Sequence, residues 1–218
     1  MSKYSLRFFL LLFLVASATF AQGSDLLIQQ YSKGPSLGQS YSKWSLYAGT
    51  EINRINTDLS TTSPTITLGA LFRLEYRFSK SVGLVTGANF TPISYSYPVS
   101  DSLGKDQLKY ISFPLFLRVH PTEKVSLGFG ALYNRFQEGL KTISLNDTSN
   151  SNAYPKGVFA NSYGFVVQGG YHFWKRFYAY FNYRWAKKTS PLTQIETNNT
   201  KGLQLGVTYT FWNSFKRQ

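Results

Sequence analysis

The sequence predicts an all-β fold, an eight-stranded antiparallel transmembrane β-barrel, and three observations lead to it. Apolar side chains occupy every second position over eight segments of the 218-residue chain, which is the period of a β-strand. The connections alternate between short turns and long polar loops. One face of each segment is apolar and uncharged, whereas the other is rich in glycine and carries the charges. An even strand number with this alternation is typical of outer-membrane barrels.

Residues 1–21 are predicted to be an export signal peptide. Lys3 and Arg7 give a positive start, residues 8–15 form a short apolar core, and small residues follow at 16–21. The apolar core is too short to cross a bilayer as a helix, which needs about 20 residues. A buried N-terminal helix is the alternative interpretation. Residues 22–43 are polar with glycine and proline, and they are predicted to be a linker.

The barrel domain is expected at 44–212, followed by a short C-terminal tail at 213–218. The predicted strands are 44–53, 65–78, 82–91, 108–119, 125–135, 163–174, 177–186 and 202–212. Short turns follow the second, fourth and sixth strands, and the predicted long loops are 53–64, 92–107, 136–162 and 187–201. Both ends of the barrel domain then lie at the short-turn side, which is expected to be periplasmic.

The apolar face of each strand is predicted to point outward. In the second strand Ile66, Leu68 and Phe72 alternate with Arg73 and Glu75. A soluble lipocalin-like barrel, with the apolar face inside, is the structural rival. An eight-stranded barrel has an interior just wide enough to be filled by side chains, and a whole face of Phe, Tyr and Leu exceeds that space. Lipid is therefore the expected surrounding of this face, and closure of the sheet satisfies the backbone there.

Aromatic residues near the strand ends are typical of interfacial girdles, although strand propensity also favours aromatic residues.

Six charged residues on the other face are predicted to form a polar and ionic network in the lumen. They are Glu51, Arg73, Glu75, Arg77, Arg118 and Arg184. Buried charges require partners, so we expect the two glutamates to pair with arginines. A structural plug is the favoured interpretation because eight strands leave little room. The alternative is a small pore with an Arg-rich polar lumen.

Residues 110–119, YISFPLFLRV, followed by a turn and VSLGFGA at 125–131, resemble the PorT-like outer-membrane β-barrel group of Bacteroidetes. The residues that match the group's pattern are Tyr110, Pro114, Leu115, Leu117 and Arg118. The resemblance covers about residues 41–212 and implies a Gram-negative envelope protein, in a group that includes a secretion-associated member. The last strand, GVTYTFW, resembles the signal that barrel-assembly machinery reads, with Tyr209 and Phe211 as candidate signal residues. A tail follows them, so the strict terminal-Phe pattern is not met.

The sequence indicates no enzyme, and we predict no catalytic residue, cofactor or metal. The chain has no cysteine, which excludes thiolate chemistry. Two histidines, His120 and His172, are expected at the periplasmic end in structural roles. Neither a Gly-x-Ser-x-Gly nor a His-Glu-x-x-His motif occurs.

The expected role is that of a structural or interaction protein integral to the outer membrane, with partner recognition in loop 136–162. The resemblance adds an association with secretion as one form of that role. Lys plus Arg outnumber Asp plus Glu by 23 to 10. One hypothesis is that basic loop residues contact lipopolysaccharide phosphates; solvated loop charges are the alternative. These residues are Lys105, Lys109, Lys141, Lys156, Lys187, Lys188 and Lys201. An exported chain is not expected to bind nucleic acid.

Overall fold

A computed structural model describes residues 41–57, 61–99, 102–145, 148–155, 158–188 and 199–214. All of them belong to one compact unit, Tyr41–Gln218. The predicted signal peptide, the linker up to residue 40 and residues 215–218 of the tail lie outside the described residues. No helix among the described residues is long and apolar enough to cross a membrane.

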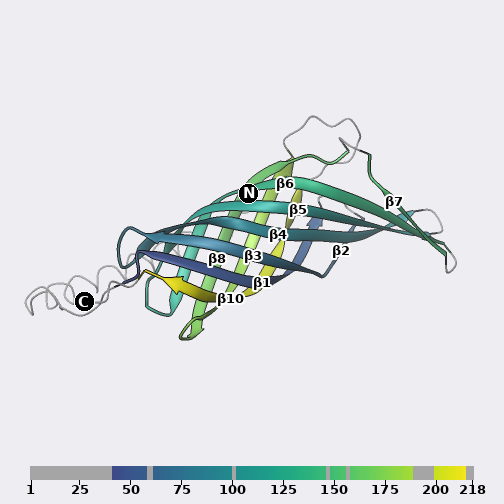
Figure 1. Cartoon of the computed structure of the whole chain (residues 1–218). Coiled ribbons are helices and arrows are strands. Elements are labelled where there is room, and N and C mark those ends of the chain that lie inside the picture. The colour runs from purple at the N-terminus through teal and green to yellow at the C-terminus, as the bar shows by residue number, and fades with distance from the viewer. Residues whose placement is uncertain are drawn as a thin grey trace, which may run out of the picture. The chain divides into compact units, whose positions relative to one another are not determined.

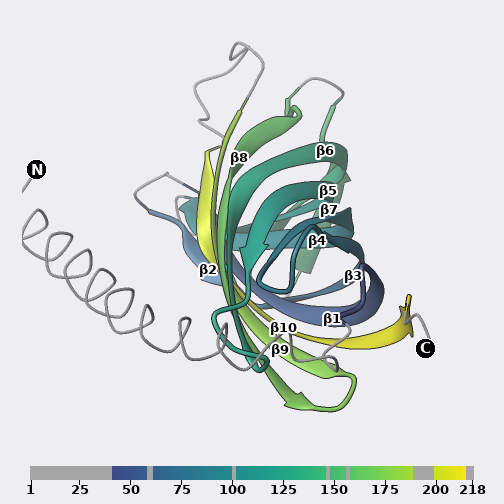
Figure 2. The ribbon, with the colours of Figure 1, turned by 90° about the vertical axis from the view of Figure 1, so that its left-hand side faces the viewer.

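Eight antiparallel strands close into a ring (Figures 1 and 2). The ring order is β4-β3-β1-β10-β9-β8-β6-β5, and β5 pairs back with β4. The strands of the ring are β1 (Trp44–Thr57), β3 (Thr67–Arg77), β4 (Val82–Val99), β5 (Ser102–Val119), β6 (Val125–Leu145), β8 (Ser162–Trp174), β9 (Phe177–Lys188) and β10 (Thr200–Asn213). Two short strands lie off the ring: β2 (Ser63–Thr65) pairs with β4, and β7 (Thr148–Ala153) pairs with β6. The predicted fold class and the three short turns are confirmed.

The strands are tilted, and the register gives the shear of the barrel. Cross-strand partners can be followed from Leu46 on β1 through β3, β4, β5, β6, β8, β9 and β10. The path returns to β1 at Asn56, ten residues beyond its start. Strand number and shear together fix the width of a barrel. A row of residues at one depth therefore runs diagonally across the strands, not along the direct pairs.

The predicted outward face is confirmed by exposure. Leu68, Phe129 and Phe165 are 72%, 59% and 62% exposed, although each lies in a strand that pairs with its neighbours. The inward positions of the ring strands are buried, and they include Glu51 on β1, Glu75 on β3 and Arg118 on β5. The apolar surface therefore surrounds the ring, and the charges lie inside it.

The strands β4, β5 and β6 run well past the predicted strand ends, which corrects two loop predictions. The segment 92–107 forms the distal part of the β4–β5 hairpin, and much of 136–162 belongs to β6 and β7. These segments form strands although neither of their faces is uniformly apolar. Their Ser, Pro, Gly and Asp residues favoured a loop in the sequence-based prediction. We call β2, β7 and the distal parts of β4, β5 and β6 the wing. In Figure 1, β7 and the distal parts of β4, β5 and β6 extend beyond the other strands. The wing marks the outer end of the barrel, and the three short turns mark the turn end.

Candidate functional site

The lumen at the turn end is organised around the buried carboxylate of Glu75 on β3. Arg118 donates from Nη1 to Glu75 Oε2 at 2.9 Å, and Arg77 donates from Nε to Oε1 at 3.2 Å. His120 Nε2 lies 2.8 Å from Oε1, and the Tyr47 hydroxyl donates to Oε2. Four partners thus surround one carboxylate that has no exposure to solvent. Such a charge is stable in a low-dielectric site only when its acceptor positions are filled.

A chain of neutral amides links this cluster to the second carboxylate, that of Glu51 on β1. Arg118 Nη2 donates to Gln168 Oε1 at 2.8 Å, and Gln168 Nε2 donates to Asn182 Oδ1 at 2.8 Å. Asn182 Nδ2 donates to Gln204 Oε1 at 3.3 Å, and Gln204 Nε2 donates to Glu51 Oε1 at 2.9 Å. The series joins β3, β5, β8, β9, β10 and β1, and it follows the inside of the wall because most of these strands are neighbours. The lumen itself is crossed by the guanidinium of Arg118, which lies 5.0 Å from the centre of the Tyr178 ring on β9.

The structure brings together some of the predicted lumen residues and leaves two arginines apart from the carboxylates. Glu51 does not pair with an arginine among the described residues; Tyr180 donates to its Oε2 at 2.8 Å instead. The guanidinium of Arg73 lies 4.7 Å from the centre of the Tyr180 ring, as a cation–π contact. Arg184 donates from Nη2 to Asn134 Oδ1 at 2.6 Å. The ion pair expected for Glu51 is therefore corrected. Tyr180 and Gln204 donate to its carboxylate instead, while Arg73 contacts an aromatic ring and Arg184 donates to an amide.

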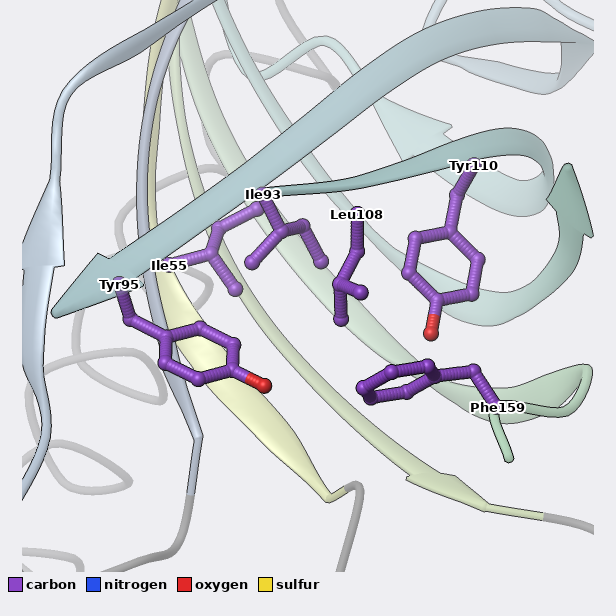
Figure 3. Close-up of a cluster of buried hydrophobic side chains, with 6 residues drawn as sticks. All are labelled: Ile55, Ile93, Tyr95, Leu108, Tyr110 and Phe159. Carbon is purple, nitrogen blue, oxygen red and sulfur yellow. The ribbon is translucent and has the colours of Figure 1, made fainter. Parts of the chain in front are cut away.

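An apolar cluster follows the polar network toward the outer end. It consists of Ile55, Ile93, Tyr95, Leu108, Tyr110 and Phe159, all buried (Figure 3). Phe159 comes from the connection between β7 and β8, and its ring lies 5.6 Å from that of Phe136 and 4.7 Å from that of Tyr154. The lumen of an outer-membrane barrel is ordinarily polar, so this mouth cluster is unusual. It behaves as a small hydrophobic core that covers the polar network.

Polar contacts hold the β7–β8 connection next to the mouth cluster. The hydroxyls of Tyr97 and Tyr154 donate to Asp106 Oδ1 at 3.0 and 2.8 Å. Burial, together with the hydrogen bond to Asp106, raises the pKa of the Tyr154 hydroxyl above its ordinary value. The Tyr154 hydroxyl thus keeps its proton, and with it the hydrogen bond to Asp106, at physiological pH.

Sequence reasoning missed several members of these clusters. The sequence places His120 at the turn end and Gln168 on the inward face without assigning either to the Glu75 cluster, and it does not single out Tyr47 or Gln204. Their roles depend on which strands meet after closure, and periodicity gives only the face of each. His172 lies beside Tyr178 with ring centres 4.8 Å apart. No group of three or more His, Cys, Asp or Glu side chains that could hold a metal occurs within the described part.

The residues of the PorT-like pattern lie on both faces of β5. Tyr110 enters the mouth cluster and Arg118 enters the Glu75 cluster, whereas Leu115 and Leu117 are exposed outside. The candidate signal residues lie outside near the end of β10. Tyr209 and Phe211 are exposed, with ring contacts to Phe177 at 5.2 Å and Phe72 at 5.8 Å respectively.

Comparison with known proteins yields structural similarity alone. No family model matches the chain, and no curated protein matches it. Ail, the attachment invasion locus protein of Yersinia pestis, is 17% identical, with 79% of this chain and 100% of Ail covered at a TM-score of 0.46. Neisserial surface protein A is 12% identical, with 79% of this chain and 100% of that protein covered, at a TM-score of 0.45. The outer membrane protein AlkL, whose structure was solved in lipid bilayers, is 12% identical, with 84% of this chain and 98% of AlkL covered, at a TM-score of 0.43. Values this low assign no function, so the chain's own geometry carries the proposal.

Proposed function

We propose that this protein is a non-catalytic outer-membrane barrel, closed to solutes, that anchors the wing for contact with a partner at the cell surface. The observation that carries the proposal is the filled lumen. Arg73 on β3 and Arg118 on β5 reach across it to the rings of Tyr180 and Tyr178 on β9. Hydrogen-bonded side chains line it from Glu75 to Glu51, and the mouth cluster covers its outer end. A barrel filled in this way is suited to hold something in place and not to conduct.

The exposed apolar belt supports the membrane placement. Large apolar side chains on all eight strands of the ring are exposed, and Leu205 and Val167 are 56% and 58% accessible. A continuous apolar surface of this kind would associate in water, but it matches hydrocarbon, and the closed ring leaves no strand edge there. The predicted export signal is consistent with an outer-membrane location.

The wing supports partner recognition as its role. Its β7 edge, Thr148–Ala153, pairs with β6 on one side, and the described side chains of Ser149, Asn150, Ser151 and Asn152 are exposed. Polar residues that project from a rigid scaffold are where binding is commonly found. We propose a protein partner for this surface, and a secretion component is the finer proposal that the PorT-like resemblance suggests.

The small pore is the second candidate function, and one observation favours it. Arg73 Nε and Nη1 and Arg184 Nε are buried in the lumen without a hydrogen-bond partner. Guanidinium groups of this kind can attract anions. Conductance in planar bilayers tests the two candidates: a closed barrel gives a flat baseline with the full-length protein. Steady anion-selective openings would overturn the closed barrel in favour of the pore.

Surface labelling tests the location and the orientation. The chain contains no cysteine, so single cysteines are unique labels. A membrane-impermeant maleimide added to intact cells should label Asn150→Cys in β7. It should label Glu123→Cys in the β5–β6 turn only after the outer membrane is permeabilised. Equal labelling of both variants in intact cells, or recovery of folded monomer without detergent, would contradict the proposed placement.

One further expectation concerns the assembly of the barrel. We propose that barrel-assembly machinery reads the end of β10 through Tyr209 and Phe211, whose exposure makes them accessible. Their replacement by alanine should reduce the amount of folded barrel in the outer membrane without changing synthesis.

A further inference from the structure

Cations mark the outer end of the apolar surface on several strands. On β1 the last apolar residue of the outward face is Ile52, and the next outward-facing residue toward the outer end is Arg54. On β10 the corresponding residues are Leu203 and Lys201. On β9 they are Trp185 and Lys187. In each case the first outward position beyond the apolar series is an exposed Lys or Arg.

The three cations lie on neighbouring strands in a diagonal row. Arg54 pairs with Leu203, and Lys201 lies two residues farther toward the outer end of β10. Lys201 pairs with Trp185, and Lys187 lies two residues farther toward the outer end of β9. Diagonal neighbours of this kind are about 7–8 Å apart. Each step from β1 to β10 to β9 therefore moves two residues outward.

The tilt of the barrel converts this diagonal into a row of nearly constant depth. The register path from Leu46 to Asn56 shows that direct pairs descend toward the turn end in the β1-to-β10-to-β9 direction. The two-residue outward steps offset that descent. Arg54, Lys201 and Lys187 thus form a single cationic row, which we call the cation row.

Aromatic rings next to the row place it at a membrane interface. Trp185 is the direct partner of Lys201, and it stacks with Phe165 at 6.3 Å between ring centres. Tyr163, the direct partner of Lys187, lies 4.9 Å from Tyr133. Tryptophan and tyrosine at the ends of an apolar belt lie at headgroup level. The cations just beyond them are therefore at the depth of lipid phosphates.

Carboxylates do not neutralise the row among the described residues. The buried Asp106 faces the wing tyrosines, and Glu138 pairs with Lys109 on β5. No described ion pair includes Arg54, Lys187 or Lys201. Within the described part of the chain, no carboxylate therefore competes with an external anion for these three cations.

We propose that the cation row binds the phosphomonoester of a lipid in the outer leaflet, as found on a phosphorylated glycolipid headgroup. A phosphomonoester carries about −1.5 to −2 charges near pH 7, and three adjacent cations complement that charge. Lys and Arg near an anionic lipid surface each contribute roughly a fivefold increase in association. The inference rests on the proposed membrane placement. Of the basic residues predicted to contact lipid phosphate, it uses Lys187 and Lys201, and it adds Arg54. Lys109 pairs with Glu138, Lys141 lies against the Tyr97 ring, and Lys156 lies outside the described residues.

Trp185 provides a reporter at the site. The chain has four tryptophans, and the other three lie toward the turn end, at Trp44, Trp174 and Trp212. Replacing those three by phenylalanine leaves Trp185 as the sole tryptophan. The full-length protein is reconstituted in phosphatidylcholine vesicles, in which brominated phosphatidic acid or brominated phosphatidylcholine replaces a rising fraction of the lipid. Quenching of Trp185 then measures how strongly each lipid is preferred beside the row.

Brominated phosphatidic acid should quench Trp185 at much lower mole fractions than brominated phosphatidylcholine. Unbrominated diphosphoryl lipid A should relieve this quenching by competition, whereas millimolar inorganic phosphate should not. In the variant Arg54→Gln/Lys187→Gln/Lys201→Gln, the preference for phosphatidic acid over phosphatidylcholine beside Trp185 should fall by about tenfold or more. The matched control Lys80→Gln/Lys124→Gln/Lys175→Gln removes the same charge from exposed sites in the three short turns and should keep it.

Other outcomes would refute the phosphate site, the lipid as its ligand, or the membrane placement. Equal preference for the two brominated lipids in the parent protein, or equal loss in the row variant and the turn control, refutes the phosphate site. Relief by inorganic phosphate would show a soluble anion site and would refute the lipid as ligand. Absence of quenching by brominated phosphatidylcholine would show that the barrel is not in lipid, and it would remove the proposed function as well. Heat-dependent migration in gels verifies that every variant is folded.

Discussion

Arg118 on β5 reaches across the lumen to Glu75 on β3, with Nη1 2.9 Å from Oε2, and neither side chain is more than 2% exposed. The two strands are not neighbours, because β4 lies between them. The same guanidinium also donates to Gln168 on β8. This residue pair therefore ties together walls of the barrel that share no backbone ladder.

Removal of one partner should cost more than removal of both. Glu75→Ala leaves Arg118 buried without its carboxylate, and losses of about 3–5 kcal/mol are typical for such a change. The double variant Glu75→Ala/Arg118→Met should be more stable than the sum of the single changes predicts. Urea unfolding in lipid vesicles measures the free energy of unfolding for the four members of the cycle. Additive single effects would show that the pair is not coupled.

Adjacent glycines on β8 offer a matched test of lumen packing. A Cβ at Gly170 would collide with the Tyr178 ring, whereas a Cβ at Gly169 would meet nothing within 4 Å. Gly170→Ala should therefore lower the free energy of unfolding by about 1–3 kcal/mol through overpacking. Gly169→Ala should be neutral or slightly stabilising.

The same vesicle assay and the additional change Tyr178→Ala test the cause. Tyr178→Ala makes room for the methyl group, so it should reduce the penalty of Gly170→Ala. Equal effects of Gly169→Ala and Gly170→Ala would contradict close packing of Tyr178 on the β8 backbone.

The period of two determined most of what the sequence could predict about the barrel. Outward Phe129 and inward Gly128 follow from alternation and from the small volume of the interior. The wing was missed because beyond the membrane neither face of a strand must be apolar, so Ser94 and Ser96 resemble loop residues. The partners of Glu75 and Glu51 were missed for another reason. Gln204 and Glu51 are far apart in the sequence and meet only after β1 and β10 pair.

The mouth cluster should depend on Phe159. Its ring is 3% exposed, and the loss of a buried phenylalanine typically costs about 3–5 kcal/mol where the site cannot collapse. Phe159→Ala should loosen the β7–β8 connection and accelerate its cleavage by an added protease in intact vesicles. The barrel should nevertheless stay closed in planar bilayers, because the polar network below the cluster is unchanged. Openings caused by Phe159→Ala alone would show that the cluster, not the network, is the barrier.

The hydrogen bond from Tyr154 to Asp106 should contribute to stability in a pH-dependent way. Tyr154→Phe removes one donor from a buried carboxylate and should lower the free energy of unfolding at pH 7 by about 1–3 kcal/mol. The pKa of Tyr154 is raised in the folded protein from an ordinary value of 10.0. Its contribution is therefore fully present below about pH 10 and is lost as the unfolded chain ionises above that pH.

Urea midpoints at pH 7 and pH 11 measure both effects of Tyr154→Phe. Wild type should lose more stability than the variant between the two pH values, since other tyrosines titrate equally in both proteins. Tyr163→Phe is the control, because that hydroxyl belongs to an exposed residue on the outer surface. An equal alkaline loss in wild type and Tyr154→Phe would show that the Tyr154 hydroxyl is not held by Asp106 in the folded barrel.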